Sequence, residues 1–91
     1  MDGLTIGRNV HYVLTGEEGI HWSDNDAAGK HRMAFVVDVL DVGTGFVELH
    51  VLLSKNDKFF TLDRELKLFV NLDVRYSDDK EPGTWHWIER A

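Results

Sequence analysis

The clearest sign of the fold is the stretch Phe46-Val47-Glu48-Leu49-His50-Val51-Leu52-Leu53, in which apolar side chains recur at every second position. Successive side chains of a β-strand point to opposite faces, so this period predicts a strand with one buried face. The residues expected to face the core are Val47, Leu49, Val51 and Leu53. Glu48 and His50 are expected to face outward.

Similar signals recur along the chain. The other segments that predict strands are Asn9–Leu14, Met33–Leu40, Leu68–Tyr76 and Thr84–Ile88. Turn sequences such as Ser54–Lys58 separate them, and a short strand is expected to open at Phe59. Thr61–Leu68 predicts one helical turn at most. The pattern therefore predicts an all-β fold, an open barrel or sandwich of about five to six short antiparallel strands with little or no helix.

Length and cysteine content narrow the class of protein. The chain has 91 residues and no cysteine, so we expect one small β domain over residues 1–91, without disulfides or thiolate metal sites. So small an interior favours binding any sizeable ligand between subunits, and hence a homo-oligomer. The first residues lack a signal-peptide pattern, and no apolar run approaches the ~20 residues of a membrane span. These features predict a cytoplasmic protein without membrane contact.

The charge balance excludes one class of partner. Sixteen acidic and ten basic side chains give a formal net charge of −6. General nucleic-acid binding needs a basic face that releases counterions from phosphates, so we expect none. A small anionic ligand stays open, because charges more than ~8 Å apart are largely screened and a few local cations suffice.

Signals for catalysis are thin. The serines, Ser23, Ser54 and Ser77, are not embedded in a glycine-flanked elbow. Gly43-Thr44-Gly45 is better explained as a hairpin turn than as a phosphate-binding loop. We therefore expect no enzyme, no catalytic residues and no cofactor.

The histidines show no metal-binding motif. They are His11, His21, His31, His50 and His86. No pair has a spacing that indicates zinc, and no cysteine supplements them. Several strands could bring three of them together, but we expect separate surface or hydrogen-bonded histidines and no bound metal.

Large rings are concentrated near the C-terminus, where Trp85 and Trp87 flank His86. Strand geometry puts both indoles on one face and His86 on the other. If the tryptophans face the core, His86 is exposed; if His86 faces inward, the indoles meet solvent or a partner. The sequence leaves both arrangements open.

Basic side chains precede two expected strands. Arg8 stands before the first, and Lys30-His31-Arg32 leads into the second. If the strand order brings them beside Trp85-His86-Trp87, the result is a stacking platform surrounded by cations. Such a platform suits a nucleotide, with its base on a ring and its phosphate on a guanidinium.

Three segments carry a resemblance to a group of small bacteriophage proteins. They are Gly7–Val13, His31–Val37 and Glu81–Trp87, and together they cover about a quarter of the chain. The group is marked by the blocks Gly-Arg-x-Val-His-Tyr, Arg-x-Ala-x-Val-Val and Pro-Gly-Thr-Trp-His-Trp-Pro. The last block is the most specific, and Ile88 departs from it by standing where a proline follows.

These phage proteins resemble anti-CBASS sponges, which sequester the cyclic nucleotide signals of bacterial antiviral defence without cleaving them. The resemblance implies an oligomeric, non-catalytic protein of the host cytoplasm that holds a cyclic mono- or dinucleotide for immune evasion. It implies stacking by Tyr12 and a tryptophan, phosphate contacts from Arg8 and Arg32, and a hydrogen bond from His11 or His86. The implied ligand-binding residues are Arg8, His11, Tyr12, His31, Arg32, Trp85, His86 and Trp87. Trp22 is a further candidate for ligand binding, because an indole in a polar loop needs a partner surface.

An alternative from another class is a small phage adaptor that binds a host or virion protein through an exposed aromatic edge. Arg8 and Arg32 separate the two hypotheses. A phosphate ligand needs both guanidinium groups converged and unpaired, whereas an adaptor leaves them scattered or salt-bridged.

Overall fold

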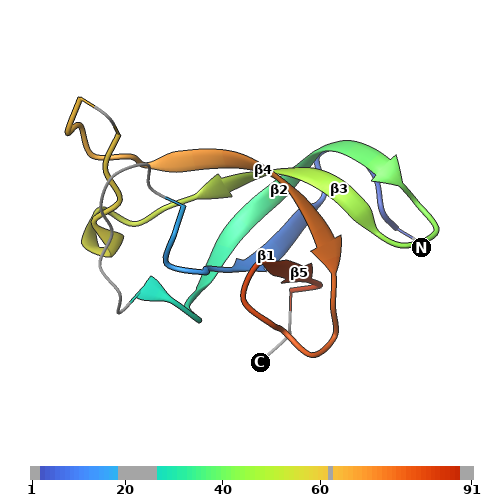
Figure 1. The fold of residues 1–91 in the computed structure, drawn as a ribbon. Coiled ribbons are helices and arrows are strands. Elements are labelled where there is room, and N and C mark those ends of the chain that lie inside the picture. The colour runs from blue at the N-terminus through green and yellow to red at the C-terminus, as the bar shows by residue number, and fades with distance from the viewer. Residues whose placement is uncertain (1–2, 19–26, 62, 89–91) are drawn as a thin grey trace.

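A computed structural model of the protein describes residues 3–18, 27–61 and 63–88. Its elements are β1 (Asn9–Val13), β2 (His31–Asp41), β3 (Phe46–Leu52), the 3-10 turn η2 (Lys55–Asp57), β4 (Phe69–Tyr76) and β5 (Thr84–His86). The strands form a closed barrel in the order β1-β2-β3-β4-β5 (Figure 1). The predicted all-β fold is confirmed, and the sheet is closed rather than open.

Closure of the barrel depends on the short strand β5, which lies between the first and fourth strands. It pairs antiparallel with β1 and parallel with β4, while the other neighbouring pairs are antiparallel. With an odd number of strands in sequential order, one neighbouring pair has to run parallel. This pair is the one departure from the expected antiparallel order, and it makes β1 a neighbour of both β2 and β5.

The core lies on the inner face of the sheet and follows the predicted alternation. Val47, Leu49 and Val51 of β3 are fully buried, whereas His50 between them is only half-buried. The largest fully buried side chains are Trp85 and Phe59. Burying a large apolar side chain contributes about 1.5–3 kcal/mol. This packing holds the alternate, outward-facing residues of each strand in fixed positions.

The described residues contain little helix, as expected. The helical turn predicted in Thr61–Leu68 is wrong for residues 61 and 63–68, where Phe60 and Leu66 form a β-bridge. Arg64 has φ 64°, a left-handed conformation that interrupts a helix. The described helix is the η2 turn, inside the predicted turn Ser54–Lys58. None of the described residues forms a helix long and apolar enough to cross a membrane.

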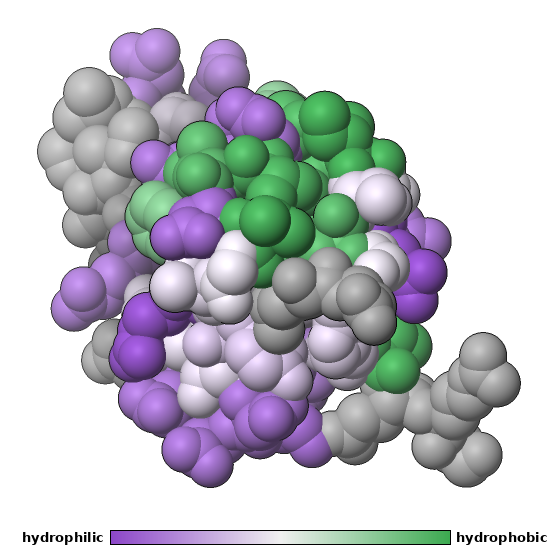
Figure 2. Space-filling model, turned by 90° about the vertical axis from the view of Figure 1, so that its right-hand side faces the viewer, coloured by the Kyte–Doolittle hydropathy of each residue, from purple (hydrophilic) through white to green (hydrophobic). Residues whose placement is uncertain are grey.

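The surface at one end of the barrel carries exposed apolar side chains. Figure 2 looks onto the end that holds the β2–β3 turn in Figure 1, and apolar residues gather over part of it. Leu40, Val42 and Phe46 at this turn are exposed. The adaptor hypothesis expects an exposed aromatic edge; Trp85 does not contribute to one, because its indole is fully buried, whereas Phe46 is exposed.

Candidate metal centre

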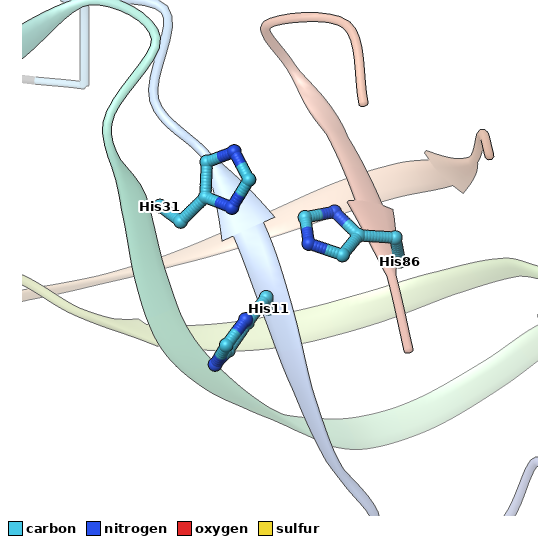
Figure 3. A group of neighbouring side chains, drawn as sticks. All are labelled: His11, His31 and His86. Atoms are coloured by element: carbon cyan, nitrogen blue, oxygen red, sulfur yellow. The ribbon is translucent and has the colours of Figure 1, made fainter. Parts of the chain in front are cut away.

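Three histidines from three strands lie close together on the outer face of the barrel (Figure 3). His11 is in the middle of β1, His31 begins β2 and His86 ends β5. Each offers one ring nitrogen, and these three atoms lie within 4.8 Å of one another. The ring centroid of His86 is 4.7 Å from that of His31 and 5.6 Å from that of His11. We call this group the histidine cluster.

Barrel closure explains how residues from both ends of the chain meet. His11 lies directly opposite His86 in the β1–β5 pair. On the other side of β1, His31 lies opposite Val13. Residues two apart on a strand share a face, so His31 sits diagonally across from His11 on the same outer surface.

Burial of His86 is the least expected feature of the cluster. Trp85 faces the core, yet His86 on the opposite face is only 2% exposed, because the rings of His11 and His31 pack against it. The expectation that an inward tryptophan leaves His86 exposed is therefore wrong. Neither ring nitrogen of His86 has a hydrogen-bond partner among the described residues. Leaving a buried polar group unsatisfied costs about 1–3 kcal/mol.

Burial and neighbouring charges favour neutral rings at His11 and His86. Burial, followed by the charges of His31, His11 and Lys80, lowers the pKa of His86 to about 4. Burial first, and then the charge of His31, also lowers the pKa of His11. Neutral imidazole is the form that binds a metal ion. At neutral pH, His11 and His86 are therefore in the form that can act as ligands.

The geometry is suited to Zn²⁺. Zinc binds imidazole nitrogens at about 2.0–2.1 Å in a tetrahedral arrangement, which puts the nitrogens roughly 3.4 Å apart. The ring nitrogens, within 4.8 Å of one another, would have to approach by up to ~1.4 Å to reach that spacing. Three protein ligands, as the described residues supply, leave a tetrahedral ion one position for water or another ligand. The expectation of separate histidines is therefore wrong for these three.

Tyr12 and Trp85, expected to take part in ligand binding, are core residues. Tyr12 is 3% exposed, and its hydroxyl donates a hydrogen bond to Glu18 Oε1 at 3.0 Å. Burial, followed by the charge of Glu18 and this hydrogen bond, raises the pKa of Tyr12. The indole N–H of Trp85 donates to the carbonyl oxygen of Gly45 at 2.7 Å. A stacking role does not fit side chains enclosed in this way.

Arg32, expected to bind phosphate, forms an ion pair with the buried carboxylate of Asp57. Its Nε donates to Asp57 Oδ2 at 2.8 Å, and its Nη2 donates to Oδ1. Although burial raises it, the pKa of Asp57 is lowered overall by hydrogen bonds from Arg32 and from the Ser54 backbone N–H. This bidentate pair joins β2 to η2, so the structure does not present Arg32 as a free phosphate ligand.

Arg8 and Trp87, in contrast, do come together as the sequence suggested. The guanidinium carbon of Arg8 lies 5.2 Å from the centroid of the Trp87 ring, a cation–π distance. Both residues line an open groove of about 450 Å³ together with Gly7, Asn9 and Ile88. The ion pairs among the described residues are those of Arg32 and Arg75, and Arg8 takes part in neither.

The remaining expected site residue is Trp22. It lies outside the described residues, as does His21, so its predicted role stays a prediction.

Comparisons with protein-family models, with curated proteins and with solved structures find no match to this chain. The resemblance to phage proteins also stays a prediction, and the functional argument rests on the geometry of the site.

Proposed function

We propose that this protein binds a divalent transition metal ion, with Zn²⁺ the best fit, and that the bound metal holds an anionic ligand. His11, His31 and His86 supply the metal ligands, which replaces the sequence-based expectation of no metal. The observation that carries the proposal is the convergence of three ring nitrogens within 4.8 Å, on a buried His86 whose nitrogens have no described hydrogen-bond partner.

The chemistry of the donor set supports zinc over other common ions. Mg²⁺ and Ca²⁺ prefer oxygen ligands, whereas imidazole suits zinc and its neighbours in the first transition series. Neutral imidazoles do not cancel the charge of a divalent ion, so the site becomes strongly positive once loaded. The position left by three protein ligands then attracts an anion or water.

Binding without catalysis is the better supported use of this site. A metal-bound water is a nucleophile in many hydrolases, commonly with a carboxylate beside it that acts as general base. Within the described residues, the group of possible ligands at this position contains histidines and no Asp or Glu. We therefore propose a binding protein rather than an enzyme.

The direct test is calorimetric titration of the metal-free protein with Zn²⁺, together with elemental analysis of the purified protein. We expect one tightly bound ion per chain. His86→Gln and His31→Gln should weaken the affinity by at least ~100-fold, since losing a ligand costs more than losing a group that only orients one. His50→Gln, on the same barrel but outside the cluster, should leave it unchanged. Equal affinity in all three variants would rule out this site.

A second candidate function is the one implied by the phage resemblance, sequestration of a cyclic nucleotide by a homo-oligomer. The groove beside Arg8 and Trp87 supports it, because a guanidinium held on an indole ring suits a phosphate beside a base. The ion pair of Arg32 does not meet the requirement for two unpaired guanidinium groups, and together with the burial of Tyr12 and Trp85 it restricts the proposed contacts to this groove and the histidine cluster.

Native mass spectrometry with cyclic mono- and dinucleotides tests this second candidate and reports the number of subunits. We expect a ligand adduct on a defined oligomer, with the nucleotide recovered intact after denaturation. Arg8→Met should abolish the adduct, and Arg75→Met, at an exposed arginine paired with Glu81, should retain it. No adduct with any nucleotide would remove the candidate, and a cleaved product would indicate an enzyme.

A further inference from the structure

The part of the outer barrel surface formed by β2, β3 and β4 exposes large apolar side chains. Met33, Leu52 and Phe69 are 42%, 43% and 56% exposed. Leu52 lies directly opposite Phe69 in the β3–β4 pair. Ala34 lies opposite Val51 in the β2–β3 pair, so the adjoining Met33 and Leu52 are also neighbours. The three exposed side chains therefore form a row across three strands, which we call the apolar row.

A row of carboxylates crosses the same three strands further along. Glu48 of β3 lies directly opposite Asp38 of β2 and Asp73 of β4, and we call these three residues the acidic row. Glu48 and Leu52 are on the outward-facing side of β3, four residues apart, which corresponds to about 13–14 Å along the strand. The stacked ring of His50 lies between them. This surface thus carries apolar side chains at one end and negative charge at the other.

The acidic row receives no ion pair from the residues that the structure describes. Like charges directly opposite one another on neighbouring strands destabilise a sheet. The ion pairs of Arg32 and Arg75 are with carboxylates outside this row. Asn71 Nδ2 donates a hydrogen bond to Glu48 Oε2 at 3.2 Å, but an amide brings no positive charge. A cation supplied by a partner would relieve the repulsion.

Barrel closure decides the form of partner that this surface accepts. The strands β2, β3 and β4 are each paired on both sides, so they present side chains and no free edge for an added strand. An α-helix satisfies its own backbone hydrogen bonds and presents side chains along one face. Because a helix rises about 1.5 Å per residue, side chains about eight to nine residues apart reach the two rows.

We infer that the apolar row and the acidic row form a docking face for a basic amphipathic helix of a partner protein. The helix packs apolar side chains against Met33, Leu52 and Phe69, and its lysine or arginine side chains meet the carboxylates about two turns further along. A second copy of this chain suits the face less well, because it brings a further formal net charge of −6. The inference goes beyond the proposed metal binding and does not depend on it.

The test uses two synthetic helical peptides of about 16 residues, which is about 24 Å of helix. The basic peptide carries two leucines one turn apart and, about two turns further along the same face, two arginines. In the acidic peptide, glutamate replaces both arginines. Fluorescence anisotropy measures the binding of each labelled peptide to the protein. We expect the basic peptide to bind about 10-fold more tightly, and added salt to reduce this difference.

Substitutions of exposed residues locate the binding site. Leu52→Ser should weaken binding of the basic peptide about 10-fold. Ile6→Ser, at an exposed isoleucine outside the docking face, should leave it unchanged. Asp73→Asn should weaken it about 3-fold, within the range of one exposed ion pair. Asp79→Asn removes the same charge from the turn after β4 and should have no effect. Unfolding temperatures establish that each variant is folded.

Three results would overturn the docking face. The first is equal affinity for the two peptides, or binding of neither at about 1 mM. The second is wild-type affinity in a folded Leu52→Ser. The third comes from sedimentation of the protein alone: a wild-type dimer that Leu52→Ser abolishes would assign the face to a second copy. Zinc titration of the same samples reports on the metal centre separately, so each proposal can fail without the other.

Discussion

Histidines on the outer face of the barrel occupy two contrasting environments, the stack around His50 and the histidine cluster. On β3, His50 lies between Phe35 and Phe69, with centroid distances of 4.9 and 4.8 Å and rings within 22° and 19° of parallel. Its Nδ1 is hydrogen-bonded to Asn71 Oδ1 at 2.8 Å. In the histidine cluster the rings meet edge to face, and neither nitrogen of His86 has a described partner.

The difference shows that cross-strand neighbours, rather than the residue type, decide what a histidine does. Two flanking phenylalanines stack on the His50 ring, and Asn71 forms a hydrogen bond with one of its nitrogens. His50 therefore acts as a packing residue. In the histidine cluster, the three rings lie on adjacent strands, and the polar edge of each ring faces only the other two rings. Such an arrangement is costly without a bound ion and becomes favourable with one.

Zinc-dependent stability gives the largest expected contrast between the two regions. With free Zn²⁺ about 1,000-fold above its dissociation constant, binding to the folded state should raise the free energy of unfolding by about 4.1 kcal/mol. His50→Gln should retain this gain, and His31→Gln, with an affinity at least ~100-fold weaker, should lose at least about 2.7 kcal/mol of it. His31 is exposed, so its replacement leaves the core intact. Thermal unfolding with and without zinc measures the gain, and equal gains in both variants would erase the distinction.

The pH dependence of the metal-free protein is the next largest effect. His86 has a folded pKa of about 4, below its usual 6.5, so the unfolded chain binds more protons between these values. Stability should therefore fall as the pH drops from about 6.5 to about 4, by up to about 3 kcal/mol. His11, whose pKa is also lowered, acts in the same direction.

Urea unfolding of the metal-free protein at several pH values checks this effect. His86→Leu should flatten the curve over the same window. The pKa of the Asp57 carboxyl is lowered from 3.8. Its contribution to stability is therefore lost only at pH values more acid than the range over which His86 titrates. A variant curve with the wild-type slope would show that His86 does not titrate as described.

A smaller effect is expected in the stack around His50. His50→Ala removes two ring contacts, each of a type that contributes about 0.5–1.5 kcal/mol, so we expect a loss of roughly 1 kcal/mol of stability at this partly exposed site. Zinc affinity should not change. Urea unfolding and zinc titration of the same sample measure both quantities, and weaker zinc binding would mean that the two regions are coupled.

The smallest expected effect is that of Asn71→Ala. Asn71 is exposed, and its side chain hydrogen-bonds His50 and donates to Glu48 Oε2 at 3.2 Å. We expect a loss of about 0.5 kcal/mol, at the low end for a hydrogen bond, because water replaces the lost partner. Urea unfolding measures it. A loss as large as that of His50→Ala would show that the hydrogen bond, rather than ring packing, holds His50.

Strand positions could be predicted from the sequence because alternation is local. The inward side chains of β3 follow directly from every second residue being apolar, and each strand end lies within two residues of its prediction. The helical turn near Thr61 could not be excluded in this way, since the left-handed conformation of Arg64 and the bridge between Phe60 and Leu66 depend on the tertiary fold.

The candidate site was less predictable, because its residues are neighbours only in the closed barrel. No spacing along the chain links His11, His31 and His86. A usable signal is that the large rings Tyr12 and Trp85 face inward, which forces the adjacent His11 and His86 outward. Recognising their contact also requires knowing that the last strand pairs with the first. That pairing follows from closure of the barrel. The sequence predicts the fold class, a barrel or sandwich, but not which strands pair.

The most direct test of the metal centre is the absorption spectrum of the protein titrated with Co²⁺, which takes the geometry of a zinc site and reports it in its visible bands. The account predicts intense bands of a four-coordinate ion that saturate at one Co²⁺ per chain, disappear on addition of Zn²⁺ and are absent from His86→Gln and His31→Gln. A weak spectrum of the wild type like that of the hydrated ion, or wild-type bands that persist in both variants, would contradict a metal site at these histidines.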